Sequence, residues 1–203
     1  MREFVASLDR MLLLDSPRFA DAYDRLRADY HRLEIHQAVF AGQAYPADPA
    51  EAGRFVDEQL AAARDRAAAA GLSDRIRFEA TSAADTPGEA YDLVTMFDCL
   101  HDMGDPVGAA KQVRRLIADD GTWMVVEPRA GDRVEDNLNP VGRAYYGFST
   151  LLCTPASLSQ EVGLALGAQA GPARIRDVVS AAGFTRFRIA AQTPFNNVFE
   201  VRP

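Results

Sequence analysis

The stretch YDLVTMFDCLHDMGDPVGAAKQVRRLIADDGTWMVVEP, residues 91–128, decides the fold. Its apolar runs at 91–100 and 121–128 predict two buried strands, and the residues at 105–121 between them have helical spacing. A crossover of this length joins parallel strands, with the helix packed on the sheet. The stretch therefore predicts a strand-helix-strand unit of an α/β protein.

The helix at 105–121 carries its own start and stop signals. Asp105 can cap the first turn, and Pro106 has the fixed φ that suits the first helical position. Gly121 stands where a C-terminal cap is needed. Three apolar residues at helical spacing should face the sheet, and these are Val107, Val113 and Leu116.

Further strands and helices extend the alternation toward the C-terminus. The last two strands are close enough to form a hairpin, so the last strand should be antiparallel to its neighbours. We expect a mostly parallel sheet with helices on both faces. One helix should end at Gly71, before the first strand, and another should span 173–184, before the last two strands. The predicted strands are 75–83, 91–99, 121–127, 185–192 and 198–202.

The chain divides by pattern into residues 1–53 and residues 54–203. The first part carries apolar residues at helical spacing and is expected to be a helical N-terminal segment. Within it, LEIHQAVF at 33–40 alternates apolar and polar residues, which fits a strand or the end of a helix. The second part is expected to be a single α/β domain.

Composition narrows the class of protein. The 203 residues carry a net charge of -7, so no basic block is available to bind nucleic acid. No run approaches the roughly 20 apolar residues that cross a bilayer, which leaves a cytoplasmic protein without a membrane partner as the default. Cys99 and Cys153 stand far apart and form no CxxC pair, so we expect reduced thiols and no metal site.

Polar side chains follow the predicted strands at 91–99 and 121–127. Phe97, Asp98 and His101 come after the first strand, and Glu127 ends the second. Ligands of open α/β sheets bind at the carboxyl ends of the strands. We therefore expect these four side chains to border a pocket. His101 and Glu127 could handle protons there, or could simply hydrogen-bond to neighbouring loops.

The segments YDLV, FDCLHDMGDP, RRLIADDG and WMVVEP resemble the second half of a class I S-adenosylmethionine-dependent methyltransferase. The resemblance covers roughly residues 54–203, and 133–171 is similar to the long insertion of one bacterial subgroup. It implies a Rossmann-like sheet that ends in an antiparallel strand, with S-adenosylmethionine as cofactor and a small-molecule methyl acceptor. It also implies that Phe97 and Asp98 lie beside the adenosyl group and that His101 lies near the sulfonium or the substrate.

The first half of the family pattern is not found. Such enzymes are similar in carrying a glycine-rich turn, D-x-G-x-G-x-G, which lets the backbone approach the cofactor. Gly42 and Gly53 are single glycines and do not form such a turn. The resemblance leaves Asp57 as a candidate for the ribose and places Ser82 and Ala83 at the adenine, with Asp57 as a solvated acid of a first helical turn as the alternative.

The missing first strand has a structural consequence. In the family's sheet it lies next to the strand at 91–99, which would otherwise present a bare apolar edge. We expect that edge to be covered by residues 33–40, by the N-terminal helices or by a partner chain.

Three functions stay open at this point. The first is methyl transfer to a small molecule, with Tyr145 and Tyr146 as an aromatic wall for the substrate. Aromatic clusters on helices are more often core residues or contacts of a homodimer, which is the alternative for both tyrosines. The second is a degenerate methyltransferase-like protein that lacks cofactor binding and serves as a partner subunit. The third is an altered or incomplete gene product.

Overall fold

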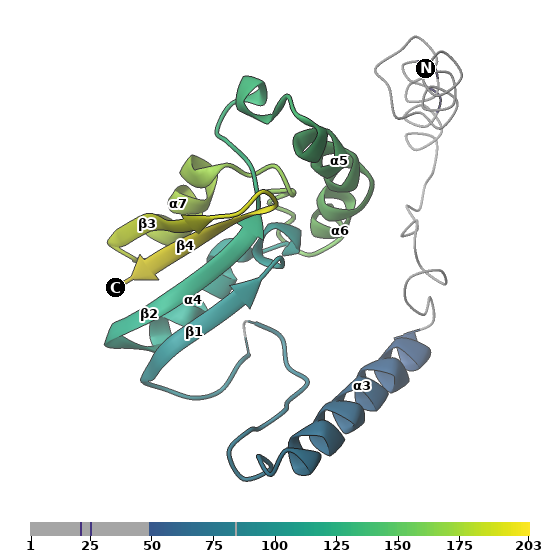
Figure 1. Cartoon of the computed structure of the whole chain (residues 1–203), viewed down its shortest axis with the longest axis vertical. Helices are drawn as coiled ribbons and strands as arrows, with labels where there is room; N and C mark the ends of the chain where they lie inside the picture. Colours follow the sequence, from purple (N-terminus) through teal and green to yellow (C-terminus); the bar gives the residue numbers. More distant parts are fainter. Residues whose placement is uncertain (1–20, 22–24, 26–48, 84) are drawn as a thin grey trace. The chain divides into compact units, whose positions relative to one another are not determined.

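Figure 1 shows a computed structural model of the protein, which describes residues 21, 25, 49–83 and 85–203. The chain separates into two compact units, Met1–Ala38 and Val39–Pro203. The predicted N-terminal helices and the predicted segment 33–40 lie outside the described residues. The predicted division after residue 53 stays a prediction.

The described strands form one mixed sheet in the order β1-β2-β4-β3. Strand β1 is parallel to β2, whereas β4 runs antiparallel to both β2 and β3. The antiparallel C-terminal strand is thus confirmed, but one parallel pairing does not make the described sheet mostly parallel. The strands are β1 Tyr91–Phe97, β2 Ile117–Pro128, β3 Arg186–Gln192 and β4 Asn196–Arg202.

Helices connect and flank these strands (Figure 1). No helix in the described ranges combines the length and apolar character needed to cross a membrane. The α-helices are α3 Pro49–Ala69, α4 Pro106–Leu116, α5 Pro140–Phe148, α6 Thr154–Leu158 and α7 Pro172–Ala181. Short 3-10 turns are η1 Leu100–Asp102 and η2 Val134–Asn137, and η3 Ser149–Cys153 is a π-helical turn.

Helix α4 begins as predicted and ends earlier. Asp105 caps it by accepting a hydrogen bond from the Gly108 amide at 2.7 Å. The helix stops at Leu116 because Ile117 already pairs with Tyr91 of β1. Gly121 is therefore a strand residue and not a helix cap, and a Cβ there would lie 2.7 Å from the Tyr91 carbonyl oxygen. The glycine permits this close approach of β1 to β2.

The predicted strand at 75–83 is wrong, because the described part of this segment contains no strand. A strand is stable only when its backbone groups pair with a neighbour. Among the described strands, β1 pairs with β2 alone, and residues 33–40, which were expected to cover its other edge, lie outside the described part of the chain. Helix α3, which ends near Gly71 as expected, begins at Pro49, so Asp57 lies beyond its first turn.

The hydrophobic core lies on one face of the sheet. Trp123 and Val125 of β2 and Phe199 of β4 are fully buried there, because alternate residues of a strand point to the same face. They share a cluster with the inner sides of α4 and α7, including Val113 and Ile175. The predicted inward face of α4 is thus confirmed.

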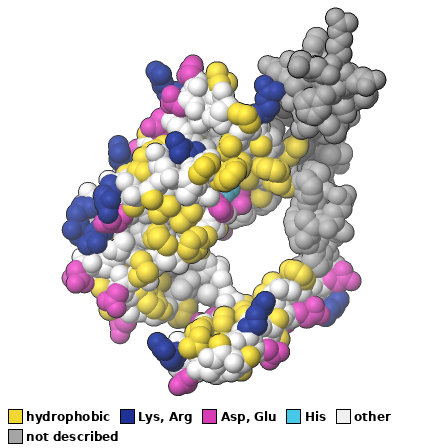
Figure 2. Space-filling model, viewed as in Figure 1, with side chains coloured by type: hydrophobic (Ala, Val, Ile, Leu, Met, Phe, Trp, Pro, Cys, Tyr) yellow, Lys and Arg dark blue, Asp and Glu magenta, His cyan; other side chains and the backbone are white. Residues whose placement is uncertain are grey.

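The opposite face of the sheet, which we call the outer face, is open. Leu93 is 56% exposed and Phe97 is 60% exposed, and both point away from the core. The register aligns Phe97 with Val126 and Val126 with Val198 across three strands. Figure 2 shows hydrophobic side chains gathered over this face. The core residues of α4 and α7 pack on the opposite face of the sheet.

We predict that truncations on the two faces differ sharply in cost. Phe199→Ala should lower the free energy of unfolding by about 3 to 5 kcal/mol, because it empties a filled core. Leu93→Ala, on the outer face, should cost less than about 0.5 kcal/mol. Urea denaturation of the two variants and the wild type measures both values. A large cost for Leu93→Ala would mean that the outer face is covered in solution.

Candidate functional site

Asp98 directly follows β1 and marks the carboxyl end of the parallel pair. Its φ of 46° is left-handed, a region that Asp tolerates better than most residues. Two contacts hold it there. The Asp98 amide donates to the Val126 carbonyl at 2.8 Å, and the Asn196 amide nitrogen Nδ2 donates to Asp98 Oδ1 at 3.1 Å. Val126 of β2 and Asn196, the first residue of β4, thus hold the residue that follows β1.

Aromatic residues lie beside Asp98. Phe97 is exposed on the outer face, and the Tyr145 hydroxyl of α5 donates to the Phe195 carbonyl at 3.0 Å. Burial and the charge of Asp98 raise the pKa of the Tyr145 phenol, which places that phenol within the field of the carboxylate. We call Phe97, Asp98, Tyr145 and Asn196 the strand-end surface.

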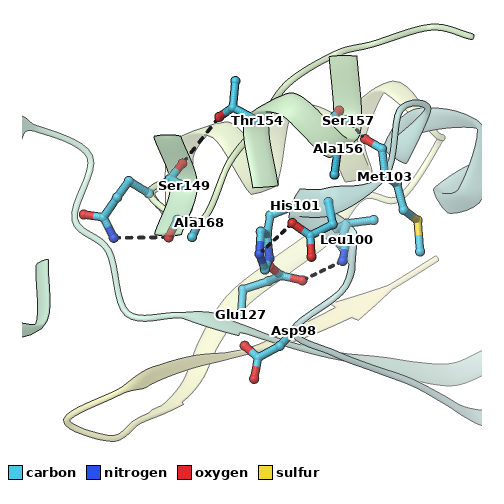
Figure 3. A network of polar contacts seen from close by, with 12 residues as sticks. Asp98, Leu100, His101, Met103, Glu127, Ser149, Thr154, Ala156, Ser157 and Ala168 are labelled. Atoms are coloured by element: carbon cyan, nitrogen blue, oxygen red, sulfur yellow. Dashed lines mark hydrogen bonds and ion pairs between the residues drawn. The ribbon is translucent and has the colours of Figure 1, made fainter. Parts of the chain in front are cut away.

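His101 and Glu127 form a buried pair (Figure 3). His101 belongs to η1 and is 4% exposed, whereas Glu127 belongs to β2 and is 1% exposed. Glu127 uses both oxygens: Oε2 binds His101 Nδ1, and Oε1 accepts from the Leu100 amide at 2.9 Å. Glu127 therefore ties the loop after β1 to the end of β2.

The other side of the His101 ring meets two more acidic groups. Nε2 lies 3.2 Å from Asp102 Oδ1, and Cys153 of η3 also contacts the ring. Burial lowers the pKa of His101, but hydrogen bonds with Cys153 and Glu127 and the charges of Glu127 and Asp102 outweigh it and raise the pKa to about 10. The surroundings of the ring thus strongly favour positive charge.

The insertion after β2, residues 133–171, holds the loop after β1 through hydrogen bonds, and we call this contact the clasp. Sequence analysis missed this feature. The fully buried Ser157 of α6 donates from Oγ to the Met103 carbonyl at 2.8 Å and accepts from the Ala165 amide at 3.0 Å. Gln160 Oε1 accepts from the Gly104 amide at 2.8 Å. The only signal for this in the sequence is a run of polar residues, SLSQ at 157–160, at the end of a short helix.

The structure brings together part of the predicted site. His101 and Glu127 contact each other, and Phe97 and Asp98 stand at the end of the same strand. Both ring nitrogens of His101 face acidic groups and the ring is buried, so His101 links the loop after β1 to its neighbours. The four residues therefore do not line one open pocket, and their catalytic and cofactor-binding roles stay predictions.

The remaining predicted residues lie elsewhere in the chain. Asp57 is an exposed residue of α3. Ser82 donates from Oγ to Asp85 Oδ2 at 2.7 Å, which occupies the hydroxyl, and Ala83 beside it is half-buried. Tyr146 is half-buried in α5 next to Tyr145. Their predicted contacts with cofactor or substrate stay untested by this geometry.

Comparison with known proteins identifies the fold. Residues 55–123 match the family model described as a methyltransferase domain. The described sheet has the antiparallel C-terminal strand expected from the resemblance. The chain shares its fold with methyltransferases. The predicted resemblance is thereby confirmed at the level of the fold.

Solved structures share this methyltransferase fold at low identity. The O-methyltransferase NcsB1 from neocarzinostatin biosynthesis is 21% identical, with 70% of this chain and 38% of that chain covered and a TM-score of 0.52. PigF with SAH is 19% identical, with 71% of this chain and 40% of that chain covered and a TM-score of 0.52. The CMeT domain of the citrinin polyketide synthase is 15% identical, with 70% of this chain and 36% of that chain covered and a TM-score of 0.51. This methyltransferase-like chain spans less than half the length of each, and no curated protein matches it in sequence.

We predict that the clasp around the loop after β1 depends on one hydroxyl. Ser157→Ala should lower the free energy of unfolding by about 1 to 3 kcal/mol, because the partly buried Met103 carbonyl and Ala165 amide lose their partner. Ser159→Ala is the matched control, since that exposed hydroxyl only contacts its own helix. Chemical denaturation measures both variants, and equal costs would contradict the clasp.

Proposed function

We propose that this chain is a methyltransferase that uses S-adenosylmethionine and acts on a small molecule. The observation that carries the proposal is the exposed pair Phe97 and Asp98 at the carboxyl end of β1, within the stretch that matches a methyltransferase domain. Ligands of open α/β sheets bind at that end of the strands. NcsB1 and PigF, which share the fold, are described with S-adenosyl-L-homocysteine, the demethylated cofactor.

The strand-end surface supplies groups suited to this cofactor. Phe97 offers an aromatic face for the adenine, and Asp98, held by Asn196, offers a carboxylate for polar groups of the ligand. Tyr145 stands beside Asp98, where an acceptor with an aromatic or apolar body would pack. We assign His101 and Glu127 a positioning role, because they fix the loop that carries Asp98.

Methyl transfer requires no covalent bond between the protein and either reactant. S-adenosylmethionine held at Phe97 and Asp98 would supply an activated methyl group, and its carbon–sulfur bond would break, with the electrons returning to sulfur, as a lone pair of the acceptor bonds to the methyl carbon. The acceptor proton leaves to a base or to water. Orientation of the two reactants and exclusion of water supply most of the acceleration.

The missing glycine-rich turn should weaken cofactor binding. Each polar group of the ligand that is desolvated without a partner costs about 1 to 3 kcal/mol. Two or three such groups weaken binding by on the order of 100-fold or more. We therefore expect this chain to bind the cofactor much more weakly than a relative with the complete motif. A chain that binds no cofactor would favour the alternative function as a partner subunit or an incomplete gene product.

The proposal also covers the partners and the cellular location of the protein. A net charge of -7 supports a protein without a nucleic acid partner, and we place it in the cytoplasm. A homodimer would bury apolar residues that are exposed in the single chain, such as Phe148 of α5. Light scattering of the purified chain tests the homodimer.

Titration with S-adenosyl-L-homocysteine tests the proposed cofactor site. We predict that Phe97→Ala weakens binding about tenfold, because stacking of an aromatic side chain on a base contributes about 1 to 3 kcal/mol. Leu93→Ala, on the same strand and the same face but further from its carboxyl end, should bind like the wild type. Isothermal titration calorimetry measures the three dissociation constants. Equal weakening in both variants would place the cofactor elsewhere.

Transfer of a labelled methyl group then tests activity. The probe is S-adenosylmethionine labelled in its methyl group, with 1,4-dihydroxy-2-naphthoic acid, the compound described with NcsB1, as a trial acceptor. Labelled product would support the enzyme. Cofactor binding without transfer would point to another acceptor, and no binding at all would favour the non-enzymatic alternative.

A further inference from the structure

We propose that His101, Asp102 and Cys153 form a binding site for a zinc ion, at which these side chains serve as three of its ligands. The site joins the loop after β1, which carries His101 and Asp102, to η3 of the insertion, which carries Cys153. It is independent of the proposed methyl transfer.

The distances fit a tetrahedral ion. One ligand atom from each of His101, Asp102 and Cys153 lies within 4.8 Å of the other two. His101 Nε2 and the carboxylate oxygen Oδ1 of Asp102 are 3.2 Å apart. Zinc binds such atoms at about 2.0 to 2.3 Å, so tetrahedral ligands stand roughly 3.3 to 3.7 Å apart. Only the Cys153 sulfur has to move closer to the other two ligand atoms, which a small rotation of its side chain can achieve.

An unsatisfied oxygen marks the place of the ion. Asp102 Oδ1 is buried and has no hydrogen-bond partner in the described structure, although His101 Nε2 lies only 3.2 Å away. A buried carboxylate oxygen without a partner is costly. A cation between the nitrogen and the oxygen would satisfy both.

Glu127 prepares the histidine for this role. Its Oε2 holds His101 Nδ1, which keeps the proton on that nitrogen and directs the lone pair of Nε2 toward Asp102 and Cys153. Metal-bound histidines are generally oriented by such a carboxylate, which also makes the imidazole a stronger ligand. Leu100 in turn donates to Glu127 Oε1 at 2.9 Å, so the carboxylate is fixed as well.

The chemistry of the donors selects the metal. A thiolate and an imidazole favour zinc over magnesium or calcium, which prefer oxygen ligands. His101 and Cys153 are 4% and 7% exposed, so the site is enclosed on the protein side. Asp102 is half-exposed and leaves a route for the ion and for a water molecule as fourth ligand. The ion replaces the protons of the thiol and of Nε2.

Cobalt provides a spectroscopic test. The full chain, purified with a chelator and then dialysed free of it, is titrated with Co²⁺ alone. We expect one equivalent to bind, with the intense ultraviolet band of a thiolate-to-cobalt charge transfer, and we expect Zn²⁺ to displace it. Cys153→Ser should abolish the band, whereas Cys99→Ser, which alters the other free cysteine, should keep it.

A second variant separates a metal site from a merely structural cluster. Glu127→Gln keeps the ligands but weakens the group that orients His101, so zinc affinity should fall by about 10- to 100-fold. Circular dichroism of each metal-free variant shows that it is folded; if Cys153→Ser is not, Asp102→Asn takes its place, with at least tenfold weaker zinc binding expected. Absence of the band in folded wild type, or its persistence in Cys153→Ser, would overturn the proposal. Unchanged zinc affinity in Glu127→Gln would do the same.

Discussion

The carboxylate of Glu127 is the contact on which the candidate site depends. It stands at the end of β2, fully buried, and binds both the Leu100 amide and the His101 ring of the loop after β1. A buried carboxylate is tolerated only when its oxygens are paired. The chain therefore keeps β1, β2 and their connecting loop in one arrangement, and the insertion closes over that loop through Ser157 and Gln160.

This arrangement separates two kinds of chemistry within a small region. The strand-end surface of Phe97, Asp98, Tyr145 and Asn196 is accessible and suits an organic ligand. In the cluster of His101, Asp102 and Cys153, the histidine and the cysteine are buried and Asp102 is half-exposed, and its donor atoms suit a cation. Both depend on the same loop, so a ligand at one place would help to fix the geometry of the other.

The two faces of the sheet differ in burial. Its inner face is a filled core of Trp123, Val125 and Phe199 under α4 and α7, whereas Leu93 and Phe97 stay exposed on the outer face. Segment 75–83 has the residue pattern of a strand but is not one in the structure. Strand formation requires a partner for each backbone group, and the described strands provide none there.

From Tyr91 onward, the sequence by itself predicted the four strands and the helices α4 and α7, because helical and alternating periodicities, Asp105 with Pro106, and the short turn before β4 act locally. It also placed Phe97, Asp98, His101 and Glu127 at strand ends. The early end of α4 was not predictable, since pairing of Ile117 with Tyr91 decides it. Only the tertiary structure turned His101 and Glu127 into a buried pair and brought Cys153 to them, because contacts between residues distant in sequence leave no periodic trace in the chain.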